Sequence, residues 1–265
     1  MDGNSITFLG TAGDITSMNK QLRASGGIIL FHNGSQFHID PGPGSLNQCK
    51  NLRINPRNTL ALIVTNNDIG HCNDTNAIIS AMTHEGMDNR GVIVGSKSVI
   101  EGSEYENSII WKRYKSYLEK NITLKAGERI GINETEFFAI PAISKDPTAF
   151  GLRINAGNTK ITYSSDTKYS SGLIRHYENS DILILKVPFL DNEENPNKMT
   201  ILDAKKIILE TAPKIVILTG LGSKFIYSDP LFITRELQRE TGTQIISAHD
   251  GMNISLNLYE KKEFY

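Results

Sequence analysis

The 265-residue sequence predicts an α/β fold in a single domain spanning residues 1–265. Two observations support this class. Short apolar runs typical of β-strands recur along the whole chain, and in the second half they alternate with stretches of helical periodicity. No internal repeat, low-complexity tract or linker interrupts the pattern, and the length suits one large domain.

The first half of the chain is rich in expected strands. Asn33 and Gly34 separate two apolar runs, and Asn-Gly favours the positive φ angles of a type I′ turn, so residues 26–40 are expected to form a β-hairpin. The continuous apolar run 59–65 predicts a strand that is buried on both faces. Asp74 is a suitable N-cap for a helix after that strand.

The second half predicts alternating strands and helices. Thr200 and Asp203 form a capping-box pattern at the start of one helix, and Gly242 ends another. The further strands are expected over residues 5–10, 91–96, 134–142, 149–155, 159–166, 181–187, 214–220, 244–248 and 253–259.

Composition narrows the function classes. The formal net charge of −1 gives no overall basic excess of the kind that binds nucleic acid or anionic lipid. No apolar run approaches the roughly 20 residues of a membrane helix, and Asp2 stands where a signal peptide carries positive charge. Cys49 and Cys72 make no disulfide framework. We therefore expect a cytoplasmic protein without a membrane partner.

Polar and glycine-rich clusters follow many of the expected strands. They are GTAGD (10–14), IDPGPG (39–44), TNNDIGH (65–71), SSDT (164–167), LTG (218–220) and AHDGM (248–252). Loops at strand ends of α/β folds are where ligands usually bind.

In their order along almost the whole chain, these motifs resemble the metallo-β-lactamase fold superfamily, in particular its phosphodiesterase-like and ribonuclease Z-like hydrolases. The resemblance implies an αββα four-layer sandwich. It also implies the signature His-x-His-x-Asp-His after a buried strand, which holds two metal ions together with an aspartate and histidines from later strands. The metals lower the pKa of a shared hydroxide that attacks a phosphodiester or acyl centre.

Setting His71 as the last histidine of the signature fixes the register on this sequence. The first two histidines then fall on Asn66 and Asp68, and the aspartate falls on Gly70. Asp166 matches the bridging aspartate. The remaining positions that usually carry histidine hold Ser144, Lys198 and Gly220.

Because Asn is a weak ligand and Gly offers only its backbone, we predict that no dinuclear centre forms and that no cofactor is held. One Zn, Mn or Fe ion on Asp68, His71 and Asp166 is the alternative. Without a metal the two carboxylates would repel each other, and a cationic side chain could replace the ion. Lys145 and Lys198, beside former histidine positions, are the candidates.

The sequence thus predicts a metallo-β-lactamase-fold protein related to metal-dependent hydrolases but lacking most metal ligands, a non-catalytic or altered paralogue that keeps a cleft. Candidate partners are a small phosphate-bearing ligand, a nucleic acid or an active relative, and a homo-oligomer stays open. The alternatives are a single-metal phosphodiesterase-like hydrolase and a structural subunit of an oligomer.

Other histidines have simpler interpretations. His32 and His38 flank the hairpin turn, and we expect them on its surface. His249 precedes an Asp250-Gly251 pair that favours a turn at a strand end, and we prefer this interpretation to a role in the site.

Overall fold

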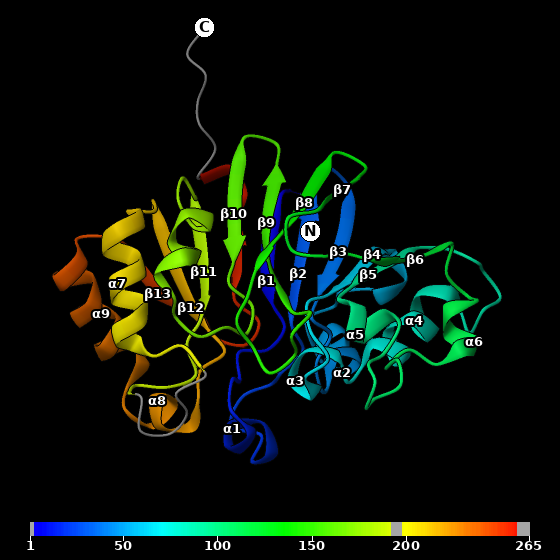
Figure 1. Cartoon of the computed structure of the whole chain (residues 1–265), viewed down its shortest axis with the longest axis horizontal. Helices are drawn as coiled ribbons and strands as arrows, with labels where there is room; N and C mark the ends of the chain where they lie inside the picture. Colours follow the sequence, from blue (N-terminus) through cyan, green and yellow to red (C-terminus); the bar gives the residue numbers. More distant parts are fainter. Residues whose placement is uncertain (1–2, 192–197, 259–265) are drawn as a thin grey trace, which may run out of the picture.

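The structure, a computed structural model, describes residues 3–191 and 198–258. Its strands form two seven-stranded sheets, and helices lie on the outer side of each sheet (Figure 1). The predicted αββα sandwich is therefore confirmed.

The first sheet is built mainly from the N-terminal half. Its strands, in spatial order, are β14 (Asn253–Ser255), β1 (Ser5–Phe8), β2 (Ile28–His32), β3 (Ser35–Ile39), β4 (Thr59–Val64), β5 (Val92–Gly95) and β6 (Lys120–Thr123). β3 to β6 are parallel neighbours, whereas β14, β1, β2 and β3 pair antiparallel. Strand β14 covers only the start of the strand expected over 253–259, and residue 259 lies outside the described part of the chain.

The second sheet is built from the C-terminal half. Its strands, in spatial order, are β13 (Gln244–Ser247), β12 (Ile215–Thr219), β11 (Ile182–Lys186), β10 (Thr159–Tyr163), β9 (Phe150–Ala156), β8 (Thr135–Pro141) and β7 (Arg129–Ile132). β10 to β13 are parallel, and the remaining pairs are antiparallel.

The helices divide between the two outer sides. One group comprises α2 (Ser45–Asn51), α3 (Ile69–Cys72), α4 (Thr75–Thr83), α5 (Lys97–Ile100) and α6 (Lys112–Lys115). The other group, which lies beside the second sheet in Figure 1, comprises α7 (Ile201–Thr211), α8 (Ser223–Tyr227) and α9 (Pro230–Thr241). Helix α1 (Ile15–Asn19) follows β1 at the lower edge of the view.

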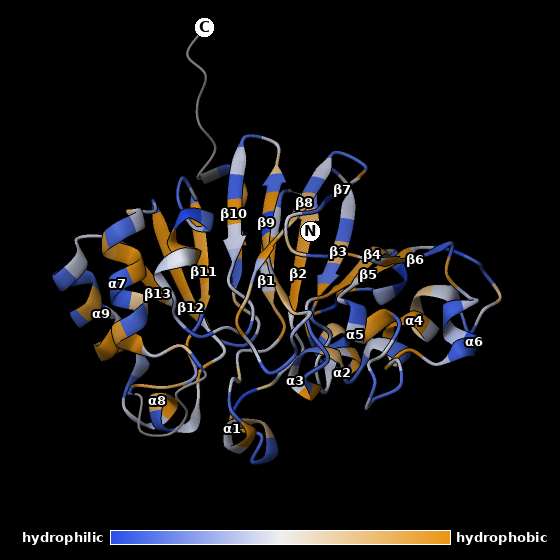
Figure 2. Ribbon diagram, viewed as in Figure 1, coloured by the Kyte–Doolittle hydropathy of each residue, from blue (hydrophilic) through white to orange (hydrophobic). Residues whose placement is uncertain are grey.

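Apolar side chains fill the space between the layers. The central cluster joins the inner faces of both sheets, and Phe37 meets Phe137 across it with ring centroids 5.0 Å apart. Separate clusters lie beneath α4 and beneath α7 and α9. Figure 2 accordingly shows apolar strands between more polar helix surfaces. Within the described residues, no helix combines the length and hydrophobicity needed to cross a bilayer.

Several local predictions are confirmed. The hairpin turns at Asn33 and Gly34 with φ values of 45° and 74°. Thr200 and Asp203 form both bonds of a capping box at α7, and Gly242 ends α9 with φ of 70°. These elements form where predicted because they depend on residues close in sequence: two side chains cap the start of α7, and Gly34 and Gly242 adopt positive φ without strain.

The surface placement of His32 and His38 was wrong. Their strands β2 and β3 lie between β1 and β4 in the middle of the first sheet, so the two side chains are 2% and 0% exposed. His32 Nδ1 lies 2.8 Å from Thr135 Oγ1, and His38 Nε2 lies 2.8 Å from the Gly26 carbonyl. The hairpin pattern predicted the turn but could not predict what covers its two strands.

The burial of His38 makes stability depend on pH. Burial lowers the pKa of His38 from 6.5 to about 4, despite the opposing effect of the Gly26 bond. Between these values the unfolded chain binds more protons than the folded chain, so stability falls as the pH falls. We expect this histidine to remove about 3 kcal/mol of the unfolding free energy between pH 7 and pH 4, measured by urea denaturation.

His38→Gln should reduce that pH dependence, whereas the exposed His249→Gln should leave it unchanged. Parallel pH profiles for wild type and His38→Gln would show that His38 is not the group responsible.

Candidate functional site

The ends of parallel strands from both sheets meet at the lower edge of Figure 1. Asp40 follows β3 and Thr65 follows β4 in the first sheet. Asp166 follows β10 and Lys186 ends β11 in the second. Because these strand ends share one edge, residues far apart in sequence come together.

The loop after β4 is fixed by local bonds. Asp68 caps α3, because its Oδ1 accepts the Gly70 N–H at 3.0 Å. Asn66 Oδ1 accepts the Asp68 N–H at 2.9 Å. Gly70 lies against Met18, whose Sδ would be 3.2 Å from a Cβ at that position. The loop therefore turns His71 inward, where it is 1% exposed.

Asp40 orients His71. Its carboxylate accepts the Thr65 N–H at 2.8 Å and the Tyr163 hydroxyl at 3.0 Å, and lies 2.7 Å from His71 Nδ1. A carboxylate that receives these donors favours the proton on Nδ1. The other ring nitrogen, Nε2, is then left as an acceptor that faces the site.

Lys186 occupies the space in front of that nitrogen. Its Nζ lies 2.5 Å from His71 Nε2 and 3.5 Å from Asp166 Oδ1. Because an ammonium group has only donors, the arrangement is a hydrogen bond from Lys186 to His71 and an ion pair with Asp166. Asp40, His71, Lys186 and Asp166 thus form one continuous chain of contacts between the two sheets.

Asp166 is held by two cations. Lys198 forms an ion pair with its Oδ2, while Lys186 faces Oδ1. Burial alone would raise the pKa of Asp166, but Lys186 and Lys198, with a smaller contribution from His71, hold it well below its usual range. Burial likewise opposes ionisation of Asp68 at the mouth of the site, and Lys186, the Gly70 N–H and His71 keep its pKa lowered.

Gly220 makes room for the Lys186 side chain. A Cβ at Gly220 would lie 2.2 Å from Lys186 Cγ and 2.9 Å from Cδ, and its φ is +60°. A side chain at position 220 and the observed path of Lys186 therefore exclude each other.

The other candidate residues from the sequence lie outside the chain of contacts that runs from Asp40 to Asp166. Ser144 and Lys145 line the adjoining pocket, and Lys145 is exposed and makes no ion pair within the described residues. His249 is also exposed. Its neighbour Asp250 accepts bonds from the Thr11 N–H and hydroxyl and from the Ala24 N–H, so it ties the C-terminal segment to the N-terminal loops.

Sequence reasoning missed Lys186. The available signal was a lysine that ends the apolar run 182–185, the same kind of strand-end residue as Asp166. Its side-chain direction depends on strand register and on the absence of a side chain at Gly220, which lies on another strand end.

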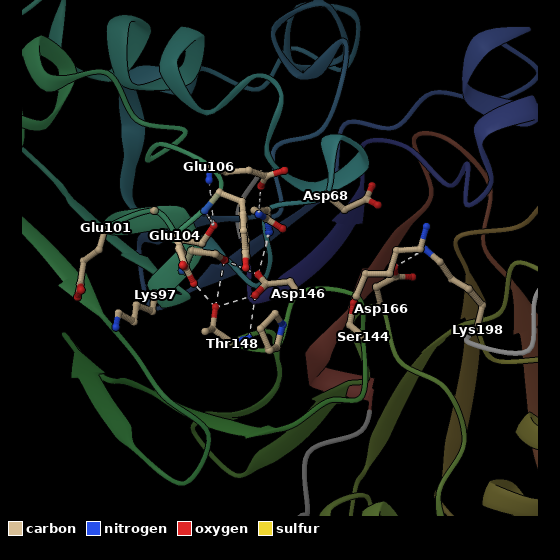
Figure 3. A pocket seen from close by; sticks show the side chains of 17 residues that line it. Asp68, Lys97, Glu101, Glu104, Glu106, Ser144, Asp146, Thr148, Asp166 and Lys198 are labelled. Carbon is tan, nitrogen blue, oxygen red and sulfur yellow. Dashed lines mark hydrogen bonds and ion pairs between the residues drawn. The ribbon is translucent and has the colours of Figure 1, made fainter.

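A large pocket lies beside Asp166 and Lys198. It has a volume of about 990 Å³, and Asp166 and Lys198 lie at one end of it (Figure 3). A second, small cavity of about 30 Å³ lies against Asp40, His71 and Lys186. The buried His71 and Lys186 thus line the small cavity, whereas Asp68, Asp166 and Lys198 line the large pocket.

Comparison with known proteins identifies the family. The model of the β-lactamase superfamily domain matches residues 35–220. The chain belongs to the β-lactamase superfamily. It has the metallo-β-lactamase fold and is related to metal-dependent hydrolases.

Similar proteins cover nearly the whole chain. The protein MJ1374 of Methanocaldococcus jannaschii, described as uncharacterized, is 30% identical over 254 residues, 95% of this chain and 94% of that protein. The metallo-β-lactamase fold protein YhfI from Bacillus subtilis is 18% identical with a TM-score of 0.79, over 96% and 99% of the two chains. Zn²⁺-bound PqqB from Methylobacterium extorquens is 13% identical with a TM-score of 0.72, over 95% and 100%.

The superfamily implies metal ions at this edge, but the donors present here do not fit one. The acceptor Nε2 of His71 faces the Lys186 ammonium, and both oxygens of Asp166 face lysines. Asp68, His71 and Asp166 are not brought together as a ligand set, and no group of three or more His, Cys, Asp or Glu side chains in the described chain could hold a metal. A lysine ammonium has no lone pair to offer an ion.

Proposed function

We propose that this chain is a metal-independent member of the superfamily that binds a ligand in the pocket beside Asp166 and Lys198, and that it does not hydrolyse substrates through a metal-bound hydroxide. The observation that carries the proposal is the position of Lys186 Nζ, between His71 Nε2 and Asp166 Oδ1. This is where an ion would need to lie to contact both donors.

The charges of the site support this proposal. Two lysine ammonium groups face the buried Asp166, and Asp40 is stabilised by the hydrogen bonds of the Thr65 N–H and the Tyr163 hydroxyl. A metal entering beside Lys186 would meet a fixed positive charge and would have to displace it. An ammonium group also cannot activate water as a metal does, because it cannot coordinate hydroxide.

Elemental analysis of protein purified without chelator tests the proposal. We expect less than about 0.1 equivalents of zinc, manganese or iron, and a melting temperature that moves by less than about 1 °C with excess EDTA or metal, because a ligand stabilises the fold only when it binds. The variants His71→Ala and Asp166→Asn should contain no less metal than wild type.

Stoichiometric metal that is lost in both variants would contradict the proposal. It would favour the single-metal hydrolase on Asp68, His71 and Asp166 instead.

A further inference from the structure

Exposed apolar side chains gather at the edge of the molecule that holds the strand-end site. Among the described residues, eleven large apolar side chains are exposed, and six of them lie on helices at this edge. These six side chains are 54–69% exposed and are called the apolar rim: Ile15, Ile69, Leu202, Tyr227, Leu231 and Phe232. Figure 2 shows apolar residues on α1, α3 and α8 at the lower edge of the view. Exposed apolar patches with polar surroundings mark interaction surfaces.

The direction of the strands explains why the apolar rim lies here. β1, β4, β11 and β12 all end at this edge. The segments that follow them therefore begin there: α1 after β1, α3 after β4, α7 after β11, and α8 and α9 after β12. The topology that brings the polar strand-end residues together thus brings the apolar rim to the same edge.

Contacts between these segments join them into one face. Met18 of α1 lies against α3, since its Sδ would be 3.2 Å from a Cβ at Gly70. Asp14, the N-cap of α1, accepts the N–H and the hydroxyl of Ser223 in α8, both at 2.9 Å. The Pro188 carbonyl, between β11 and α7, accepts a backbone N–H at the start of α8 at 3.1 Å. The helix starts that carry the apolar rim therefore adjoin one another.

Exposed cations lie on the same helices. Lys20 ends α1, Lys224 lies in α8, and Arg235 lies one turn after Leu231 in α9. Long basic side chains lay their aliphatic stems along apolar surface and keep the charged end outward. The face thus combines apolar side chains with positive charge.

The carboxylates of these helices are engaged differently. Asp14, Asp68 and Asp229 each accept backbone N–H groups at the start of their own helix. The partial positive charge of a helix start compensates such a carboxylate in part. The charge that the face offers to a partner therefore comes mainly from its lysines and its arginine.

This charge favours one partner over another. The two subunits of a two-fold dimer use the same patch, so a second copy of the chain would bring Lys20 and Arg235 against the same cations. An anionic lipid surface attracts those cations, and its interfacial layer accepts apolar and aromatic side chains such as Tyr227 and Phe232.

We propose that this face docks on the surface of a lipid bilayer that contains anionic lipids, and that docking turns the mouth of the strand-end site toward the membrane. The inference goes beyond the function proposed above and does not depend on it. The sequence led us to expect no membrane partner, because no apolar run is long enough to span a bilayer and the chain has no basic excess. Neither observation tests a face that is assembled from separate helix starts.

Sedimentation with vesicles tests the proposal. Protein in EDTA is centrifuged with vesicles of phosphatidylcholine that contain phosphatidylglycerol, or with vesicles of phosphatidylcholine alone. We expect saturable binding to the anionic vesicles, weakened about tenfold or more without the anionic lipid and about threefold or more when salt rises from about 0.02 M to about 0.3 M.

Two double variants separate the contributions of apolar surface and charge. Ile15→Gln/Phe232→Gln removes two side chains of the apolar rim and should weaken binding to anionic vesicles about tenfold. Lys20→Gln/Arg235→Gln removes two exposed cations and should weaken it about fivefold or more. Because all four side chains are exposed, the melting temperature of each variant should stay within about 3 °C of wild type.

Matched controls change the same kinds of residue elsewhere. Met87 and Leu209 are 80% and 54% exposed, and they lie after α4 and in the last turn of α7, where both helices have run away from the site. Met87→Gln/Leu209→Gln should bind within about twofold of wild type, and so should Lys50→Gln/Lys120→Gln, which removes two exposed cations from α2 and β6.

The proposal is overturned if the protein does not bind anionic vesicles at millimolar lipid, if neutral vesicles bind it equally well, or if Ile15→Gln/Phe232→Gln binds like wild type. It is also overturned if the control variants weaken binding as much as the variants of the face. A dimer in analytical ultracentrifugation that Ile15→Gln/Phe232→Gln dissociates, without any vesicle binding, would assign the face to a second copy of the chain instead.

Discussion

Lys186→Met is expected to lower the free energy of unfolding by about 3 kcal/mol, because the buried Asp166 keeps only one of its two cations and the buried His71 Nε2 loses its hydrogen-bond donor. The variant keeps most of the side-chain volume but takes the ammonium away from Asp166 and His71. Urea denaturation at neutral pH, compared with wild type, measures the loss.

Two companion variants separate charge from packing. Lys198→Met removes a lysine whose side chain is 18% exposed, so we expect a smaller loss of about 1 to 2 kcal/mol. Adding Asp166→Asn to Lys186→Met removes the carboxylate that has lost one of its two cations and should recover part of the lost stability. A loss below about 1 kcal/mol for Lys186→Met would mean that its ammonium does not serve as the internal cation.

Gly220→Ala is expected to destabilise the protein by about 2 to 4 kcal/mol, because it combines a left-handed backbone with overpacking. The added Cβ would lie 2.2 Å from Lys186 Cγ, so the lysine would have to leave its path to His71. Thermal or urea unfolding of purified variants measures the effect.

Gly157→Ala is the matched control for the backbone. Gly157 has the same φ of +60°, but a Cβ there meets only His32 Nε2 at 3.5 Å. We therefore expect a loss of only about 1 kcal/mol. In a Lys186→Ala background the cost of Gly220→Ala should shrink by about 1 kcal/mol or more, since the two side chains no longer collide. Equal losses for the two glycines in wild type would refute the packing argument.

Much of the fold follows from local sequence. Hairpin turns, capping boxes and helix-ending glycines depend on residues that are close in the chain, as at Asn33-Gly34, Thr200 and Gly242, so short-range chemistry predicts them. The burial of His38 depends instead on which strands lie beside β3. Local pattern contains no such information, and the surface prediction for this residue failed for that reason.

The site divides in the same way. His71 and Asp166 lie in polar motifs at the ends of expected strands, and the order of these motifs was enough to select them. The role of Lys186 arises from three strand ends, because its side chain passes over Gly220 to reach His71 and Asp166. The large pocket is likewise lined by the α5–α6 loop and by residues 144–148, and these two segments are some 40 residues apart in sequence. No single segment of the sequence therefore predicts the contacts of Lys186 or the lining of the large pocket.

We propose that the Lys186 ammonium stands in place of a metal ion between His71 and Asp166. Anomalous X-ray diffraction at the zinc, iron and manganese absorption edges, from crystals grown with each metal, tests it most directly. We expect no anomalous peak within about 3 Å of His71 Nε2, and we expect electron density for Lys186 that reaches this atom. A peak bonded to His71 and Asp166, with Lys186 turned away, would contradict it.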